Sequence, residues 1–261
     1  MSMEPEGYHH RGIAISWKIR TLLRSLRPST YDEVSPKIEY WIEHALTEQS
    51  IDTNDLVGRL SSSAWDGNGP ESNAAVVRFL KDFRDAPHRS ERSRSLVDGL
   101  CSRILWWFTA ASAEDLLTKS DHRCKFKKVA VVGGEGFVLA ASFVGYLIEQ
   151  GLLSQDHVRR HLIKSLTAHH YYSDRDKDHK TFRAAAIYQL LVAAGNTLLQ
   201  GLLEPEDVQV CFETLNSQIP LGGVVGLDAV KLAVRCATRS GASRRDLTCL
   251  VRSSAGSTPH G

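Results

Sequence analysis

Apolar residues recur at helical spacing along most of this 261-residue chain. The first such set, which lies between residues 12 and 27, is Ile15, Ile19, Leu22, Leu23 and Leu26. Residues three and four apart share one helix face, so this spacing predicts an amphipathic helix over 12–27, with Lys18, Arg20 and Arg24 at polar positions. Pro28 predicts the end of the helix, because proline disfavours the helical conformation at the residue before it.

A second apolar stripe predicts a helix that begins near Ser35. Its residues are Ile38, Trp41, Ile42, Ala45 and Leu46. Ser35 fits the N-cap, and Pro36 suits the first helical position, where its missing N–H costs no hydrogen bond. The preceding residues, 30–33, have the form of a capping box.

The same spacing predicts further helices as far as Leu250. Their approximate ranges are 51–60, 73–83, 96–108, 182–201, 205–215, 227–237 and 243–250. Ser61–Ser72 contains Asp-Gly-Asn-Gly-Pro and is the strongest loop signal. Only Val129–Val132 has the character of a strand. The pattern therefore predicts an all-α chain of roughly ten helices, and paired helices of similar length favour an α-solenoid of about five antiparallel hairpins.

Residues 133–166 have two competing interpretations. In the first, Val129–Val132 and the following Gly134-Glu135-Gly136 form the strand and phosphate turn of a nucleotide-dependent oxidoreductase. That fingerprint needs Gly or Ala at position 139, which is Leu139 here. It also needs a second strand after the helix, and the sequence that follows does not supply one.

In the second interpretation, residues 133–166 form two antiparallel helices. Gly151 fits the C-terminal cap of the first helix and Ser154 the N-cap of the next. The second helix carries an apolar stripe of Val158, Leu162 and Leu166. We prefer this interpretation, which places Phe143 and Leu147 in the core and leaves the oxidoreductase as the minor alternative.

Composition narrows the class of protein. The formal net charge of +2 identifies no partner by itself. The chain has five cysteines, an odd number with no Cys-x-x-Cys pair, and no run of 18 apolar residues. We therefore expect a protein without membrane contact in a reducing compartment, the cytoplasm or alternatively the nucleus. We expect a disordered leader at 1–11, a single helical domain over 12–251 and a disordered tail at 252–261.

Candidate catalytic and metal-binding motifs are incomplete. His157 and His161 lie four residues apart, a spacing that can bind zinc, but no further ligands accompany them. Asp174–Asp178 resembles the start of a calcium loop, but His179 occupies the position of the required glycine. No Walker or G-x-S-x-G motif occurs. We expect no enzymatic activity, metal, cofactor or small-molecule substrate.

Two basic clusters are the candidate sites for RNA or a protein partner. The first cluster is Arg84, Arg89 and Arg92, with His88 and Arg94 beside them. The second is Arg123, Lys125, Phe126, Lys127 and Lys128, in which the aromatic ring could stack on a base while the cations bind phosphates. The alternative is that both clusters are solvated loops.

Two motifs resemble the middle domain of translation initiation factor four-gamma. Phe143-Val144-Gly145-Tyr146-Leu147, followed by Leu153-Ser154, is similar to the family's Phe-Ile-Gly-Glu-Leu and Leu-Thr with the same spacing. Residues 19–28, Ile-Arg-Thr-Leu-Leu-Arg-Ser-Leu-Arg-Pro, are similar to the family's opening motif. The small Gly145 would permit close helix packing beside Phe143. The chain departs from the family at Leu139, where the family has Gly, and at Tyr146, where it has Glu.

The resemblance covers about Ser16 to Leu215 and implies HEAT-type helical hairpins without enzymatic activity. It implies a scaffold or adaptor in mRNA metabolism or translation, which binds a DEAD-box RNA helicase of the initiation factor four-A type, RNA, or both. The alternative is a HEAT-like protein-interaction module outside mRNA metabolism.

Overall fold

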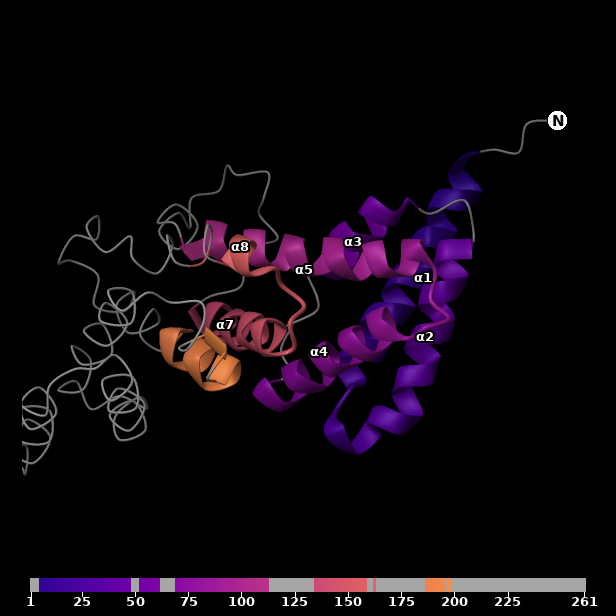
Figure 1. Ribbon diagram of the computed structural model, residues 1–261. Helices are drawn as coiled ribbons and strands as arrows, with labels where there is room; N and C mark the ends of the chain where they lie inside the picture. Colours follow the sequence, from indigo (N-terminus) through magenta and orange to yellow (C-terminus); the bar gives the residue numbers. More distant parts are fainter. Residues whose placement is uncertain are drawn as a thin grey trace, which may run out of the picture. The chain divides into compact units, whose positions relative to one another are not determined.

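The computed structural model describes residues 5–47, 52–61, 69–112, 134–158, 162, 186–195 and 197–198. Every regular element within these ranges is a helix, so the all-α prediction is confirmed for the described part of the chain (Figure 1). The chain divides into two compact units, Met1–Trp107 with Gln150–Leu153 and Phe108–Glu149 with Ser154–Gly261. The single domain over 12–251 and the number of hairpins stay predictions.

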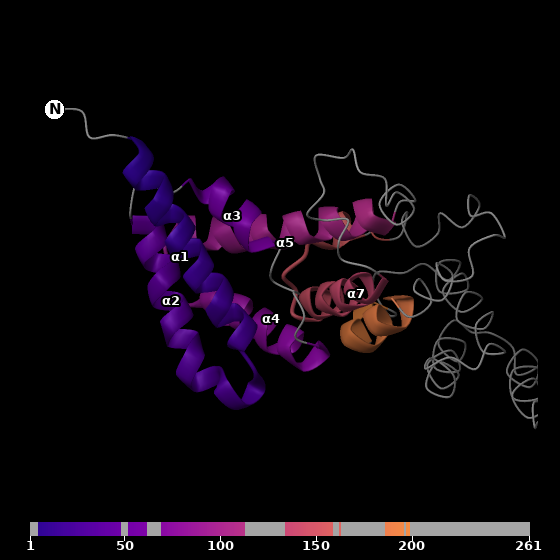
Figure 2. The same ribbon diagram turned by 180° about the vertical axis from the view of Figure 1, so that it is seen from behind.

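The first unit begins with an antiparallel helical hairpin. Helix α1 (Pro5–Ser25) leads through a 3₁₀ turn, η1 (Pro28–Thr30), into α2 (Tyr31–Thr47), and the two helices lie side by side (Figures 1 and 2). The predicted apolar positions face inward. Those that are buried are Ile15, Ile19, Leu23, Leu26, Ile38, Ile42, Ala45 and Leu46, whereas Leu22 and Trp41 are half-buried.

Both predicted helix starts in this hairpin differ from the structure. Helix α1 begins at Pro5, so residues 5–11 of the expected disordered leader are helical; proline is well suited to a first helical position. Helix α2 begins at Tyr31 rather than Ser35 and continues through Pro36. Pro36 lies near the helix start and removes one backbone hydrogen bond there. Continuing the helix back to Tyr31 buries Tyr31 and Val34 on the same face as Ile38.

The next three helices follow the predicted order with small shifts at their ends. They are α3 (Thr53–Ser61), α4 (Pro70–Asp85) and α5 (Glu91–Ser112). Asp52 caps the start of α3, because its Oδ1 accepts a 3.2 Å hydrogen bond from the Asn54 N–H. Phe79 and Phe83 of α4 are fully buried and stacked, with ring centroids 5.8 Å apart. These helices bury the apolar faces that their sequences predict.

The second unit contains α7 (Gly134–Glu149) and α8 (Gln155–His157). Between them Gly151 has φ +66°, the left-handed conformation predicted for a helix C-terminal cap. The Val158 N–H then donates a 3.1 Å hydrogen bond to the Ser154 carbonyl, which agrees with a helix beginning after Ser154. Residues 150–158 thus contain a turn and helix, where a dinucleotide-binding unit needs a strand.

Helix α7 packs closely against the helical segment at 186–195 (Figures 1 and 2). Phe143 and Leu147 are fully buried, as predicted. A Cβ placed on Gly145 would lie 2.6 Å from the Ala193 Cβ and 2.8 Å from the Leu190 carbonyl oxygen. Real Cβ atoms do not approach other atoms so closely, so only glycine fits at this position without movement of the backbone. The predicted role of Gly145 in close helix packing is confirmed.

Several predictions fall outside the described residues. They concern the strand at 129–132, the acidic connection at 174–178, the helices at 205–215, 227–237 and 243–250, and the tail at 252–261. None of the described helices is long and apolar enough to cross a membrane.

Candidate functional site

The first basic cluster lies on the connection between α4 and α5. The Ala86 N–H closes α4 with a 3.1 Å hydrogen bond to the Asp82 carbonyl, and the Arg89 N–H donates to the Ala86 carbonyl at 3.1 Å. Ser90 caps α5, because its Oγ accepts a 3.1 Å hydrogen bond from the Ser93 N–H. The backbone of this turn is therefore fixed by local hydrogen bonds, and it holds Arg89 and Arg92 at the start of α5.

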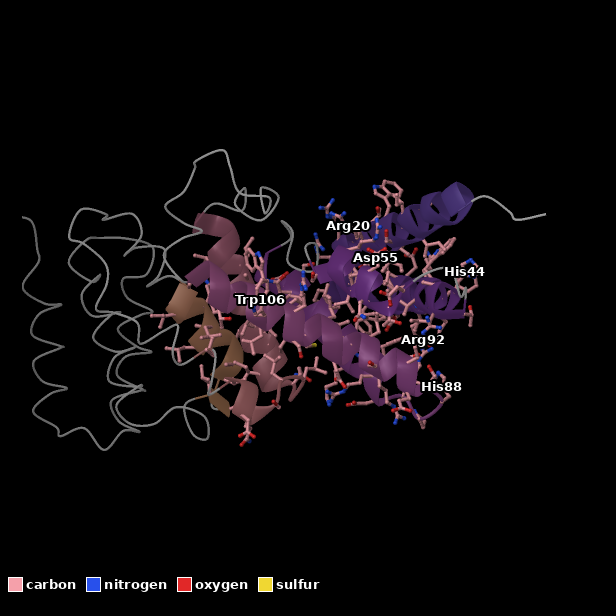
Figure 3. The ribbon with its side chains drawn as sticks, turned by 90° about the horizontal axis from the view of Figure 1, so that it is seen from above. Arg20, His44, Asp55, His88, Arg92 and Trp106 are labelled. Carbon is pink, nitrogen blue, oxygen red and sulfur yellow. The ribbon has the colours of Figure 1, made fainter. Side chains whose placement is uncertain are left out.

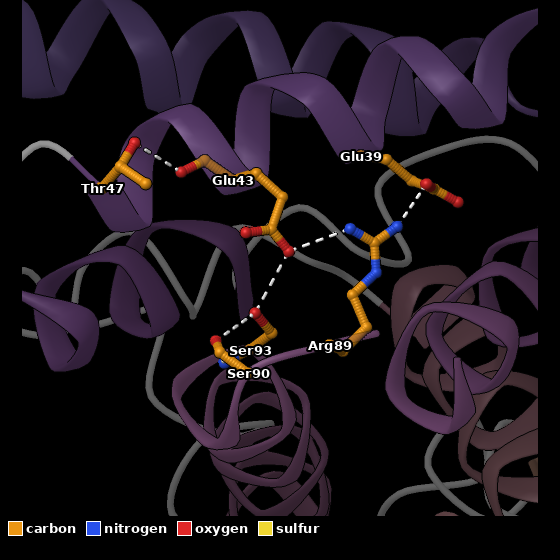
Figure 4. Close-up of polar contacts among 6 residues, drawn as sticks. All are labelled: Glu39, Glu43, Thr47, Arg89, Ser90 and Ser93. Carbon is orange, nitrogen blue, oxygen red and sulfur yellow. Dashed lines mark hydrogen bonds and ion pairs between the residues drawn. The ribbon is translucent and has the colours of Figure 1, made fainter. Parts of the chain in front are cut away.

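The Arg89 side chain points toward two glutamates of α2 (Figure 4). Its Nη1 lies 2.9 Å from Oε1 of Glu43, and its Nη2 is paired with Oε2 of Glu39. Ser93 Oγ donates to the same Glu43 oxygen at 3.1 Å and lies 2.8 Å from Ser90 Oγ. One guanidinium group and two serines therefore connect the start of α5 to α2.

The surroundings of Arg89 strengthen these ion pairs. Its side chain is only 7% exposed, and the guanidinium lies 4.3 Å from the centroid of the Phe83 ring, a cation–π contact. Glu39 and Glu43 keep 38% and 36% of their side-chain surface exposed, so solvent partly screens the pairs. Nε of Arg89 is buried without a hydrogen-bond partner among the described residues. Arg89 thus joins helices inside the unit.

Arg92 makes a second connection, to the end of α2 and the start of α3. Its Nη1 donates a 2.5 Å hydrogen bond to the Leu46 carbonyl, and its Nε donates to Thr53 Oγ1 at 3.3 Å. Leu46 lies in the last turn of α2, where carbonyls have no partner within their own helix. Arg92 therefore satisfies one of these carbonyls while its residue remains exposed at the surface (Figure 3).

Arg84 lies in a polar depression on α4 and α5. Its Nε is 3.0 Å from Asp85 Oδ1, and its Nη1 is 3.6 Å from Asp98 Oδ1. These three side chains and Arg94 line a shallow depression of about 500 Å³. The hydrogen bond from Lys81, and then that from Arg84, hold the pKa of Asp85 below its ordinary value. The depression carries both signs of charge and has no selectivity for anions.

The structure thus gives structural partners to Arg84, Arg89 and Arg92. Among the neighbours expected with them, His88 and Arg94 are exposed. The second cluster, Arg123, Lys125, Phe126, Lys127 and Lys128, lies outside the described residues, so its role stays a prediction. No group of three or more potential metal ligands occurs within the described ranges.

An exposed indole on α1 belongs to neither predicted cluster. The side chain of Trp17 is 63% exposed, and Lys18 is exposed beside it. The sequence contains a signal for this arrangement, because position 17 lies off the apolar spacing of 15, 19, 23 and 26. A large aromatic residue at a polar position of an amphipathic helix indicates exposure.

Comparison with known proteins identified no relative of this chain. No protein-family model matches the chain, and neither a curated protein nor a solved structure is similar to it.

Proposed function

We propose that this protein is a non-catalytic scaffold or adaptor in mRNA metabolism or translation. It binds a DEAD-box RNA helicase of the initiation factor four-A type, RNA, or both. The proposal includes an α-solenoid of about five antiparallel helical hairpins, since stacked hairpins offer an extended surface to partners.

The observation that supports this proposal most is the packing around Gly145. Gly145 is the small residue at the centre of the motif that resembles the initiation-factor family, and Phe143 beside it is fully buried. The atoms nearest to a Cβ built on Gly145 belong to Leu190 and Ala193, about 45 residues further along the chain. Stacked helical units require contacts of this kind, in which one helix packs against another helix later in the chain.

The basic run at 123–128 carries the proposed contact with RNA or the helicase. The guanidinium groups of Arg84, Arg89 and Arg92 already have partners within the unit, so they position α4 and α5. Cations in the 123–128 run are adjacent in sequence and have Phe126 among them, which suits phosphate binding with base stacking.

Binding to purified four-A-type helicase and to a fluorescent single-stranded RNA tests the proposal. The test variant is Lys125→Gln/Lys127→Gln/Lys128→Gln. The control is Lys37→Gln/Arg59→Gln/Lys81→Gln, which also removes three positive charges, each from an i,i+4 ion pair on α2, α3 or α4. Exposed pairs of this kind contribute little to stability, so the control variant should fold.

We expect the parent and the control to bind and the test variant to bind more weakly. If all three lysines contact phosphates, the slope of log affinity against log salt should fall by about 2 in the test variant. Absence of helicase binding together with salt-insensitive behaviour toward RNA would contradict the proposal. A pull-down that contains no ribonucleoprotein component would instead favour an interaction module outside mRNA metabolism.

A further inference from the structure

One side of α1 presents an indole and positive charges to solvent. We call this side the α1 outer face and define it by Ile13, Trp17, Lys18, Thr21 and Arg24, all of which are exposed. Ile13 is 41% exposed and Trp17 63% exposed. Arg20 is half-buried at the edge of this face, and Figure 3 shows its position on α1.

The packing of α1 determines which residues form this face. Ile15, Ile19 and Leu23 point inward, where α1 packs against α2 and α3. The exposed positions 13, 17, 21 and 24 follow one another at intervals of four, four and three residues, so they align along the opposite side of the helix. At 1.5 Å per residue they span about 16 Å. The face is therefore a continuous ridge supported by a buried core.

The charge on this ridge has one sign. The described side chains of α1 include Lys18, Arg20 and Arg24 but no Asp or Glu. Neither Lys18 nor Arg20 forms an ion pair or a side-chain hydrogen bond within the described part of the chain. By contrast, the arginines at the start of α5 have partners on α2 and α3. Lys18 and Arg20 are thus available to an external anion.

An exposed aromatic ring beside several cations is the arrangement that binds single-stranded nucleic acid without sequence preference. The ring stacks on a base while the cations contact phosphates. A protein-docking surface would instead have an apolar centre, and lysine is depleted in such centres. Here Ile13 and Trp17 are the only large apolar side chains exposed on the described part of α1, and Lys18 and Arg24 are exposed among them. The observations therefore favour RNA over a protein partner.

We propose that the α1 outer face binds single-stranded RNA. The indole of Trp17 stacks on a base, and Lys18 and Arg20 contact the phosphates on either side. This inference rests on the RNA-binding part of the proposed function and adds a second RNA-binding surface to the basic run at 123–128.

Fluorescence anisotropy with a labelled oligouridine tests the assignment on the full chain. The first variant is Trp17→Ala, and its control is Tyr40→Ala, because Tyr40 has the same 63% exposure but lies on α2 beside Glu39. Loss of one stacked base corresponds to about 5- to 150-fold weaker binding for Trp17→Ala. Tyr40→Ala should bind as tightly as the parent, and Trp17→Phe should recover most of the affinity.

A second pair of variants measures the phosphate contacts. Lys18→Gln/Arg20→Gln should lower the slope of log affinity against log salt by about 1.4, the value for two single-strand phosphate contacts. Lys37→Gln/Lys81→Gln removes the same charge from α2 and α4 and should leave the slope unchanged. Circular dichroism should show equal helix content in all variants.

Three results would overturn the inference. If the parent binds RNA and Trp17→Ala binds it equally well, the surface lies elsewhere and the proposed function stands. If the parent does not bind RNA, the RNA part of the proposed function fails as well, while helicase binding is decided by the separate assay with purified helicase. If the α1 variants lose helicase binding but keep RNA binding, the face docks a protein.

Discussion

Phe143 is the residue with the clearest structural role, since it is fully buried in α7. We expect Phe143→Ala to lower the free energy of unfolding by about 3–5 kcal/mol, because truncation loses apolar burial and leaves a cavity. Urea denaturation followed by circular dichroism measures the effect. Val192→Ala is the control, because Val192 is 50% exposed and its truncation should change stability by less than about 0.5 kcal/mol. A Phe143→Ala protein as stable as its parent would show that the packing around α7 is wrong.

Also at the scale of single residues, we expect Cys101 to make the stability of the protein depend on pH. Burial, and then the nearby charge of Asp98, raise the pKa of the Cys101 thiol to about 12, whereas a thiol in the unfolded chain ionises near pKa 8.5. The folded state therefore holds the proton more strongly. The contribution of Cys101 is fully present below about pH 8.5 and is lost as the pH rises toward 12, at about 1.4 kcal/mol per pH unit.

Unfolding of the parent and of Cys101→Ala between about pH 8.5 and 10.5 checks this. Burial, and then the hydrogen bond to Asp82, also raise the pKa of Tyr31. Because Tyr31 is present in both proteins, its effect cancels in the comparison. We expect the parent to lose stability with pH more steeply than the variant. Equal slopes would mean that solvent reaches the thiol in the folded state.

At the scale of elements, two glycines in helices should respond in opposite directions to the same substitution. Gly145→Ala should destabilise the protein by about 1–3 kcal/mol, because the new Cβ meets the Leu190 carbonyl and Ala193, and the backbone would have to move. Gly58→Ala in α3 should stabilise it by about 0.5–1 kcal/mol, because nothing lies within 4 Å and alanine favours helix. Thermal melts of both variants measure the difference. Similar shifts in both would contradict the close packing of α7.

The contact between α5 and α2 depends on Arg89. Arg89→Met should lower the free energy of unfolding by about 1–3 kcal/mol, since it leaves Glu39 and Glu43 unpaired while preserving much of the apolar volume. This loss of stability is smaller than that expected for a fully buried ion pair, because both glutamates are more than one-third exposed. Arg94→Met, at an exposed position in the first turn of α5, is the control and should be nearly neutral. Chemical denaturation distinguishes the two variants.

At the scale of the whole molecule, the proposals require a helical protein with no dinucleotide site. The far-UV circular dichroism spectrum of the full chain should be dominated by helix. NAD⁺ and NADPH at millimolar concentration should leave the melting temperature unchanged, because a ligand raises it only by binding the folded state. A concentration-dependent increase would revive the oxidoreductase alternative built on Gly134–Gly136.

The helices within the described ranges were predictable from local sequence. Helical hydrogen bonds join residues four apart, and a helix with one buried face has apolar residues at intervals of three and four in its sequence. The stripe from Ile15 to Leu26, the glycine turn at Gly151 and the burial of Phe143 follow from such local signals. The starts of α1 and α2 were predicted wrongly, because Pro5 and Pro36 are each compatible with a helix start and only the burial of Tyr31 and Val34 extends α2 backward.

The tertiary structure alone decided which polar residues remain available to a partner. Arg89 illustrates this, since the sequence of its basic loop predicted a surface site. Pairing of Arg89 with Glu43, 46 residues earlier, depends on how α5 meets α2. The contact between Gly145 and Ala193 likewise depends on how two segments far apart in the sequence pack together. Sequence by itself determined the helices, because their energetics are local; the fold determined their partners and exposed faces, because those depend on contacts between distant segments.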